Sequence, residues 1–247
     1  MTKPPISKIV LLGLVVGVGA LIAVMLAGIG TRADWWSYRT GFDILRPAAW
    51  TGLGGVVVAV IGVIHALIAT RRGIAIALVG VAAGVLAYGV PSTSLKKARF
   101  LPKIHDITTD TASPPLFVVA LEARKKAKAK NSTKYAGEKI AKLQRKAYPD
   151  IVTLKRAERP GLLFAKALAA VKSEGWEILS ADKAKGRIEA IDTTFWFGFK
   201  DDIVIRIASD GGTGSQLDIR SVSRVGRSDA GANAARIRRF FVAMKAL

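Results

Sequence analysis

The sequence predicts a membrane-anchored α+β protein, in which three transmembrane helices precede an antiparallel sheet domain of order β-α-β-β-β-β-α. Long uncharged apolar runs are confined to the first 90 of its 247 residues, as expected for helices that cross a bilayer. Further along, short alternating runs between glycine-rich turns indicate strands, and stretches with a helical period indicate helices. We therefore expect a transmembrane region over 1–94, a linker and basic helical segment over 95–150, and the α+β domain over 151–247.

Three segments are expected to span the membrane, over residues 9–29, 48–70 and 73–90. The first holds 21 residues without a charge, which is about 31 Å of helix and matches a bilayer core of about 30 Å. It is too long for a removable signal peptide and lacks the small-residue cleavage pattern, so we expect it to be retained. The connection over 30–47 contains tryptophan and arginine, as in loops at the head-group level, and the third span is expected to end at Pro91.

Small and polar residues within the spans have two interpretations each. Gly13 with Gly17, and Gly80 with Gly84, have the G-x-x-x-G spacing that lets helix backbones approach closely. They could mediate oligomerisation, or pack the three helices of one chain together. His65 is the one ionisable residue within a span, which marks either a functional site or a side chain that is hydrated near the interface.

Positive charge is concentrated in the middle of the chain. The net charge is +20, and residues 96–159 alone carry 17 basic and 6 acidic side chains. This segment follows the last apolar run directly, and no nucleic-acid-binding motif is recognisable. We therefore expect anionic lipid head groups, and no nucleic acid, as its partner. The absence of cysteine excludes a disulfide framework, a zinc–thiolate site and a thiol nucleophile.

A polar linker and a basic segment connect the spans to the sheet domain. The linker, 95–115, is punctuated by proline and carries the motif HDITTD at His105–Asp110. Residues 116–146 predict two helical pieces broken near Asn131 and Ser132. The lysine-rich helix lies either on a membrane surface, with its basic stems extended toward phosphate, or against the domain with a solvated face.

The α+β domain begins with a strand over 151–155 and a helix over 161–174, which has Pro160 at its start and Gly175 at its end. Four strands are expected next, over 176–181, 187–196, 202–208 and 216–222. A closing amphipathic helix follows, with Ser228 as its N-cap. The result is an antiparallel sheet with helices against one face.

Alternation along the last two strands places polar side chains on the sheet face opposite the helices. Arg206, Asp218 and Arg220 share this face, with Glu189 nearby in the expected strand order. These residues form either a lattice of cross-strand ion pairs or, together with Arg224, a cleft whose guanidinium groups bind a carboxylate or an anionic head group.

The turn before the closing helix is a second candidate ligand site. It brings hydroxyl and guanidinium groups to the free N–H groups of a helix N-terminus, which favours an anion. The Asp229 carboxylate could instead take the place of that anion and cap the helix itself. Together, the residues expected to bind a ligand are Arg206, Arg220, Ser223, Arg224, Ser228, Asp229 and Asn233.

An acid–base or hydrolytic site would use His105, the one histidine outside the membrane part, with Asp106, Asp110 or Asp202. Such chemistry requires at least two of these groups within hydrogen-bond reach of one substrate atom, which their spacing does not enforce. HDITTD has no zinc or calcium ligand spacing, so no metal and no cofactor are expected. Aspartate and threonine are also common in turns and caps.

Five short motifs in the second part of the chain resemble one known family. They are HDITTD at His105–Asp110, AYPDI at Ala147–Ile151, GRIEA at Gly186–Ala190, FGFKDD at Phe197–Asp202 and RSVSRVGRSDAGANAARIR at Arg220–Arg238. In this order they are similar to the bacterial DUF1499 family, a domain of unknown function, over residues 95–247. The resemblance implies a membrane-attached or exported domain with no established chemistry.

The orientation of the spans is open on charge alone, because basic residues flank both of their sides. The resemblance favours an exported domain, so we expect the N-terminus in the cytoplasm of a bacterium and the C-terminal domain on the periplasmic side of its inner membrane. We expect a non-enzymatic, multi-pass membrane protein whose domain binds an anionic lipid head group or a partner protein at the membrane surface. The alternative is an envelope hydrolase that uses His105 with nearby carboxylates.

Overall fold

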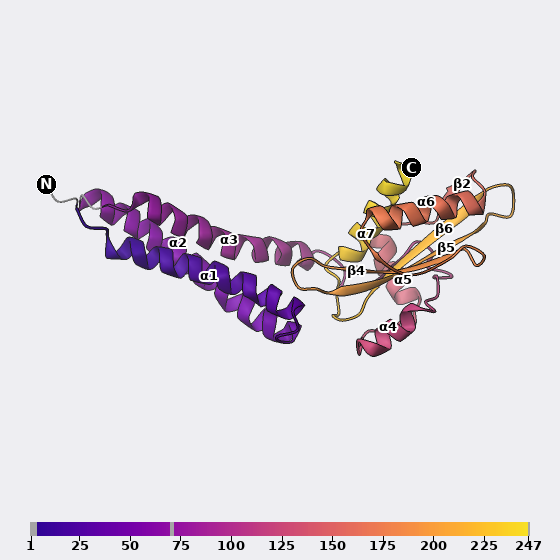
Figure 1. Ribbon diagram of the computed structural model, residues 1–247, viewed down its shortest axis with the longest axis horizontal. Helices are drawn as coiled ribbons and strands as arrows, with labels where there is room; N and C mark the ends of the chain where they lie inside the picture. The colour runs from indigo at the N-terminus through magenta and orange to yellow at the C-terminus, as the bar shows by residue number, and fades with distance from the viewer. Residues whose placement is uncertain (1–3, 70–71, 247) are drawn as a thin grey trace. The chain divides into compact units, whose positions relative to one another are not determined.

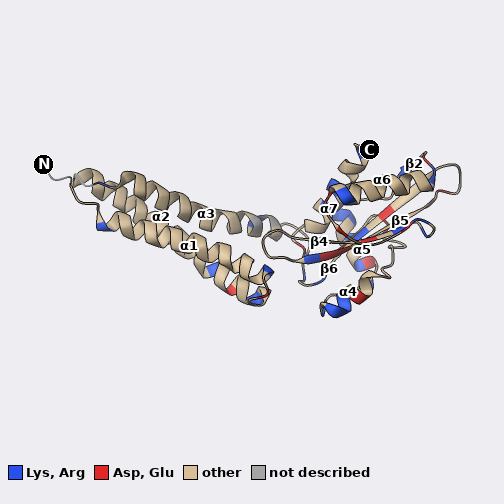
Figure 2. Cartoon of the chain, viewed as in Figure 1, with Lys and Arg blue, Asp and Glu red and all other residues tan. Residues whose placement is uncertain are grey.

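The computed structural model describes residues 4–69 and 72–246, which form two compact units (Figure 1). The first unit extends to Lys97 and also includes Phe195–Gly198. The second unit comprises the remaining residues from Ala98 onward. Charged side chains are sparse along the helices of the first unit and dense in the second (Figure 2).

Three long helices make up most of the first unit: α1 over Lys8–Arg32, α2 over Tyr38–Ile68 and α3 over Ile74–Arg99. All three are long and apolar enough to cross a membrane, which confirms the prediction of three candidate spans. The start of α2 and the end of α3 differ from the predicted boundaries. The predicted loop is mostly helical, because the Ser37 hydroxyl accepts the Thr40 N–H and starts α2 early. Helix α3 continues through Pro91, whose lost hydrogen bond a long apolar helix tolerates.

The glycine pairs of the spans lie at contacts between helices of the same chain. A Cβ atom built on Gly13 would lie 2.6 Å from the Ala59 Cα atom, and one built on Gly17 would overlap the Gly80 carbonyl. Packing within the chain therefore uses both predicted spacings, because only glycine permits this approach of two backbones. His65 lies in the last turn of α2, where its Nδ1 atom is 2.9 Å from the Ser7 hydroxyl.

The second unit contains one antiparallel sheet of six strands, in the order β1-β6-β5-β4-β3, with β2 also paired to β6. The strands are β1 Asp106–Thr108, β2 Leu154–Arg156, β3 Glu177–Asp182, β4 Arg187–Thr193, β5 Lys200–Ser209 and β6 Ser215–Ser223. The helices are α4 Ala120–Lys126, α5 Glu138–Ala147, α6 Pro160–Ser173 and α7 Ala232–Lys245. From β2 to α7 the elements follow the predicted order, which confirms the α+β class.

Strand β1 lies in the stretch that the sequence predicted as linker. Its three residues pair with the far end of β6, where Asp106 lies opposite Val222. The side chain of Gln144 in α5 extends this pairing, since it accepts the Thr108 N–H and donates to the Thr108 carbonyl. Aspartate and threonine predicted a turn here, but their polar groups are bonded within the domain, so the segment is buried and extended.

The two faces of the sheet are covered by different elements. Helices α6 and α7 pack on one face over an apolar core that includes Ile205 and Ile219, which lie opposite each other in β5 and β6. On the other face, Phe117 and Ala120 pack against Val204 and Val222. Figure 1 shows α6 and α7 on one side of the sheet and α4 on the other. The face that carries the predicted arginines is therefore covered by the chain itself around Val204 and Val222, whereas Arg206 stays partly exposed.

Candidate functional site

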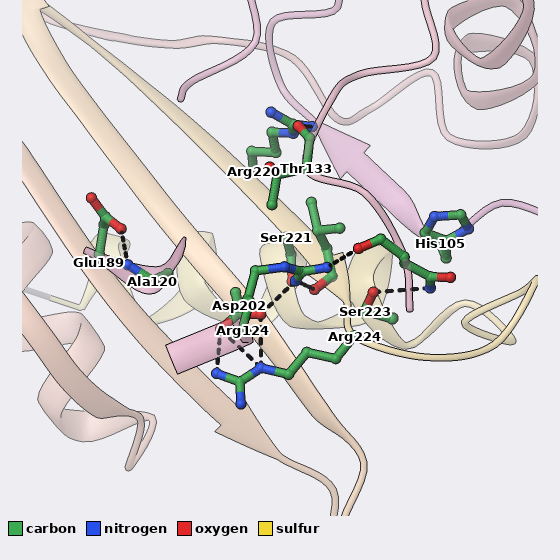
Figure 3. A network of polar contacts seen from close by, with 12 residues as sticks. His105, Ala120, Arg124, Thr133, Glu189, Asp202, Arg220, Ser221, Ser223 and Arg224 are labelled. Carbon is green, nitrogen blue, oxygen red and sulfur yellow. Dashed lines mark hydrogen bonds and ion pairs between the residues drawn. The ribbon is translucent and has the colours of Figure 1, made fainter. Parts of the chain in front are cut away.

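Buried arginines and carboxylates form the most prominent polar feature of the second unit (Figure 3). The adjacent Asp201 and Asp202 follow Lys200, the first residue of β5, and alternation along the strand sends their side chains to opposite faces. Asp201 accepts a hydrogen bond from Arg236 of α7, whereas Asp202 accepts from Arg124 of α4. One dipeptide thereby anchors the elements on both sides of the sheet.

Asp202 is completely buried and is shared by two guanidinium groups. Arg224 binds it in a bidentate manner, with Nε 2.9 Å from Oδ2 and Nη2 2.6 Å from Oδ1. The Nη1 atom of Arg124 donates to the same carboxylate, and both arginines are themselves buried. Two positive charges surround one negative charge, so this cluster has an excess positive charge beneath α4.

Asn131 joins the end of the α4 segment to the turn that follows β6. Its side-chain amide donates to the carbonyls of Ser223 and Gly226, at 3.0 and 2.9 Å. The backbone N–H groups of Lys130 and Asn131 also donate to this turn, at the Arg224 carbonyl. These bonds fix the position of the loop between α4 and α5.

Arg220 was predicted as a ligand-binding residue, and the structure places it inside the domain. Only 1% of the residue is exposed, and its Nε and Nη2 atoms bind the two Asp106 oxygens at 2.9 and 2.7 Å. It also donates to the carbonyls of Pro115 and Thr133. An external anion would therefore have to displace Asp106 in order to bind Arg220.

Two aromatic rings enclose this guanidinium group. Its central carbon lies 5.4 Å from the ring centroid of Phe117 and 5.6 Å from that of Tyr135. The Tyr135 hydroxyl is buried and has no hydrogen-bond partner among the described residues. Burial, together with the nearby Asp106 carboxylate, raises the pKa of Tyr135 to about 12.

Arg206 forms a second, partly exposed cluster near the other end of the same face. Its Nη2 atom donates to Asp218 at 2.7 Å and to Asp110 at 2.9 Å. Burial opposes ionisation of Asp110, but bonds from the Ser113 N–H and from Arg206 outweigh it, so the pKa of Asp110 is lowered. The cross-strand ion pairs predicted for this face are therefore present between Arg206 and Asp218.

The turn after β6 differs from the predicted cap. Helix α7 begins at Ala232, after Gly231 at φ 83°, and Ser228 is not its N-cap. Instead, the Asp229 carboxylate accepts the N–H groups of Gly231 and Asn233, and so takes the place of an external anion. The Ser228 hydroxyl accepts the Ala230 N–H within the turn, before the helix begins. Burial raises the pKa of Asp229 despite these bonds.

Asn233 and Ser223 connect the start of α7 to strands β1 and β6. The Asn233 amide donates to the Ser223 hydroxyl at 3.0 Å and to the His105 carbonyl at 3.1 Å. Its oxygen accepts from Ser221 and from Arg236. Both predicted residues thus hold three elements together.

The predicted acid–base residues do not bond to one another in the described part of the chain. Asp106, Asp110 and Asp202 are each paired with arginine, and His105 uses its backbone carbonyl rather than its ring. Among the described residues, no three histidine, aspartate or glutamate side chains are grouped as metal ligands would be.

Sequence reasoning missed Arg124, although the run ARKKAKAK contains a signal. Arg124 is its one arginine and is buried, whereas Lys125, Lys126, Lys128 and Lys130 are all exposed. Arginine is preferred for buried ion pairs because its planar group binds carboxylates in two places and is weakly hydrated. The single arginine among lysines thus identified the structural residue of the run.

The exposed lysines lie beside a shallow pocket of about 350 Å³ at the end of α4. It is lined by Leu121, Arg124, Lys125, Lys128, Ala129, Asn131, Ser132 and Thr133. Cationic side chains and hydroxyl groups at one opening suit a phosphate or another small anion. Arg124, which binds the buried Asp202, is one of these lining residues.

Comparison with known protein families matches most of the second unit. A family model described as "Protein of unknown function (DUF1499)" matches residues 106–244, more than half of the chain. This range begins with β1 and ends within α7, so it contains the whole sheet and both clusters of arginine and aspartate. No curated protein matches the chain.

Proposed function

This chain belongs to the DUF1499 family of proteins of unknown function, and we propose that it is a multi-pass membrane protein whose α+β domain binds anionic lipid head groups at the bilayer surface. The lysine surface, defined as Lys125, Lys126, Lys128 and Lys130, carries this proposal. We further propose that the membrane is a bacterial inner membrane, with the N-terminus in the cytoplasm and the domain on the periplasmic side.

The positive charges of the lysine surface have no carboxylate partners among the described residues, unlike those of the arginines. The arginines are paired with carboxylates, Arg220 with Asp106, Arg206 with Asp218, and Arg124 and Arg224 with Asp202, whereas none of the four lysines forms an ion pair within the described chain. A lysine near an anionic leaflet contributes about 1 kcal/mol at physiological ionic strength, so four supply roughly 4 kcal/mol. That is sufficient to hold a domain that the membrane helices already keep nearby.

Lys128 occupies a backbone position that glycine normally fills. It has φ 50° and follows the last turn of α4, where the Ala129 N–H donates to the Arg124 carbonyl and the Lys128 N–H to the Lys125 carbonyl. This is the Schellman motif, in which a non-glycine residue is strained. A lysine that weakens the helix end while lining the pocket supports a role in binding rather than in stability.

In this proposal, the residues that the sequence predicted to bind a ligand have a structural role. Arg220, Ser223, Arg224 and Asn233 are buried, and they hold the loops behind the lysine surface. They position the lysines and do not touch the lipid. Arg206, Ser228 and Asp229 are partly exposed and lie in clusters of their own.

Energy transfer between the domain and the lipids tests this function. The naturally cysteine-free chain, reconstituted in lipid nanodiscs, receives a donor dye at Ala136→Cys, an exposed position after the lysine surface. Acceptor dyes are placed on the lipid head groups. Transfer should be more efficient with phosphatidylglycerol than with phosphatidylcholine alone, and added salt should reduce the difference.

Two matched triple variants make this experiment specific. Changing Lys125, Lys126 and Lys128 to Gln should abolish the dependence on anionic lipid. Changing three exposed lysines elsewhere to Gln removes the same charge and should preserve it; these are Lys155, Lys172 and Lys183. Equal transfer in both lipids, or equal loss in both triple variants, would overturn the proposal.

A further inference from the structure

The segment before the lysine surface exposes an unusual run of apolar side chains. In the sequence LFVVAL, Phe117 and Ala120 are buried against the sheet, while the other four side chains face solvent. The exposed fractions are 74% for Leu116, 48% for Val118, 40% for Val119 and 43% for Leu121. Consecutive exposed aliphatic residues are avoided in soluble domains unless they meet a partner.

From this run we infer that Leu116–Leu121 inserts into the interfacial layer of the bilayer, beside the lysines that bind its head groups. The inference rests on the proposed function and adds a second mode of contact to it. Lysine stems reach toward phosphate while the neighbouring aliphatic side chains enter the boundary between head groups and acyl chains.

Glu189 fixes the direction of these apolar side chains. This residue of β4 is completely buried, and its carboxylate accepts the N–H of Val118 at 3.0 Å and that of Ala120 at 2.8 Å. Figure 3 shows the bond to Ala120. Phe117 is held at the same time in the small core with Val204 and Val222. The outward direction of the remaining side chains is thus set by buried contacts, so little ordering is required when they enter a membrane.

A bilayer fits this surface better than a protein or a second copy of the chain. The apolar run is followed immediately by the lysine surface, with Glu122 as the one acidic residue between them, and an anionic bilayer provides apolar and negative groups in adjacent layers. The chain also connects a membrane helix to this domain directly. Helix α3 ends at Arg99 and β1 begins at Asp106, so the domain stays near the bilayer that α3 crosses.

An environment-sensitive dye tests insertion in the full-length chain. We would attach the fluorophore NBD to a single cysteine at Leu121→Cys, with reconstitution in nanodiscs that hold one chain each. As a matched control, the same dye is attached at Leu162→Cys in α6, which is also exposed but lies on the other side of the sheet. With phosphatidylglycerol present, the dye at position 121 should shift to shorter wavelength and be quenched by spin-labelled acyl chains, whereas the dye at 162 should do neither.

The outcomes separate this inference from the proposed function. If the dye at 121 remains water-like while energy transfer from Ala136→Cys still depends on anionic lipid, insertion is wrong and head-group binding stands. If neither signal depends on anionic lipid, both proposals fail. If the blue shift requires two chains in one disc, or an added acidic protein instead of the lipid, the apolar run meets a protein and insertion is overturned.

Discussion

Arginine and lysine have separate tasks in this domain, and burial divides them. Arg124, Arg220 and Arg224 each bind a buried carboxylate, while the lysines beside them remain in water. The physical reason is that a guanidinium group can replace its hydration with several directed hydrogen bonds, which an ammonium group on a flexible stem cannot do as well. We therefore expect substitution of these arginines to lower the stability of the domain, and substitution of the lysines to weaken lipid binding.

We expect the Arg220→Met variant to lower the free energy of unfolding of the domain by about 3–5 kcal/mol, because Asp106 is left charged and buried. The double variant Asp106→Leu, Arg220→Met should recover part of this loss, since no charge is then buried without a partner. Hydrogen exchange of the β6 amides in the full-length chain measures both effects. Unchanged protection in the single variant would show that the pair contributes nothing to the fold.

Tyr135→Phe should raise the free energy of unfolding by about 1 kcal/mol, because it removes a buried hydroxyl without a partner. The effect depends on pH. The pKa of Tyr135 is raised from 10.0 to about 12, so the folded chain holds the phenol proton more tightly than the unfolded chain does. The stability that comes from this tighter binding is fully present below pH 10 and is lost as the pH rises through 12. Thermal unfolding of wild type and variant across this window should show a smaller alkaline loss for the variant, and parallel curves would contradict it.

At the scale of elements, the position of the segment that contains α4 is set by its contacts with the sheet. It closes the second face of the sheet through Phe117 and Ala120, and Arg124 fastens it to Asp202. Its exposed side chains include four aliphatic ones within 116–121 and the lysine surface that follows them in the sequence. The C-terminal end of α4 lies within the lysine surface, and the backbone after it is strained at Lys128, which allows stability and binding to be tested separately.

Lys128→Gly should stabilise the domain by roughly 0.5 kcal/mol, because glycine adopts positive φ without strain but loses more chain entropy on folding. Lys126→Gly is the matched control. It removes the same charge from the last residue of α4, which does not have a positive φ, so glycine costs chain entropy there and relieves no strain. Both variants should weaken the dependence of energy transfer on anionic lipid, while their unfolding midpoints move in opposite directions. Midpoints that both fall would mean that Lys128 is not strained.

For the whole molecule, the side of the membrane on which the domain lies decides which lipids and proteins it meets. A cysteine at Thr213→Cys, in the exposed turn between β5 and β6, should react with a membrane-impermeant thiol reagent in intact bacterial cells if the domain is periplasmic. Pro4→Cys, before α1, should be protected until the cells are lysed. The reverse pattern would place the domain in the cytoplasm and make cytoplasmic partners the relevant ones.

The regular elements were predictable because their signals are local. Uncharged runs identified three candidate spans, and alternation identified β3 to β6 in their correct order. Element ends were predicted less well, as α2 and α3 are both longer than expected. The strand β1 was missed because its three residues show no period of their own and are extended only by pairing with β6.

What the sequence determined by itself was the division into apolar spans and an α+β domain, since hydrophobicity and its period act over neighbouring residues. The tertiary structure alone decided which charges are buried and which are available. Arg220 meets Asp106 across 114 residues of chain, and Arg124 meets Asp202 across 78. An arginine that binds a ligand and one that binds a distant carboxylate have the same local pattern, because the difference depends on contacts that only the folded chain creates.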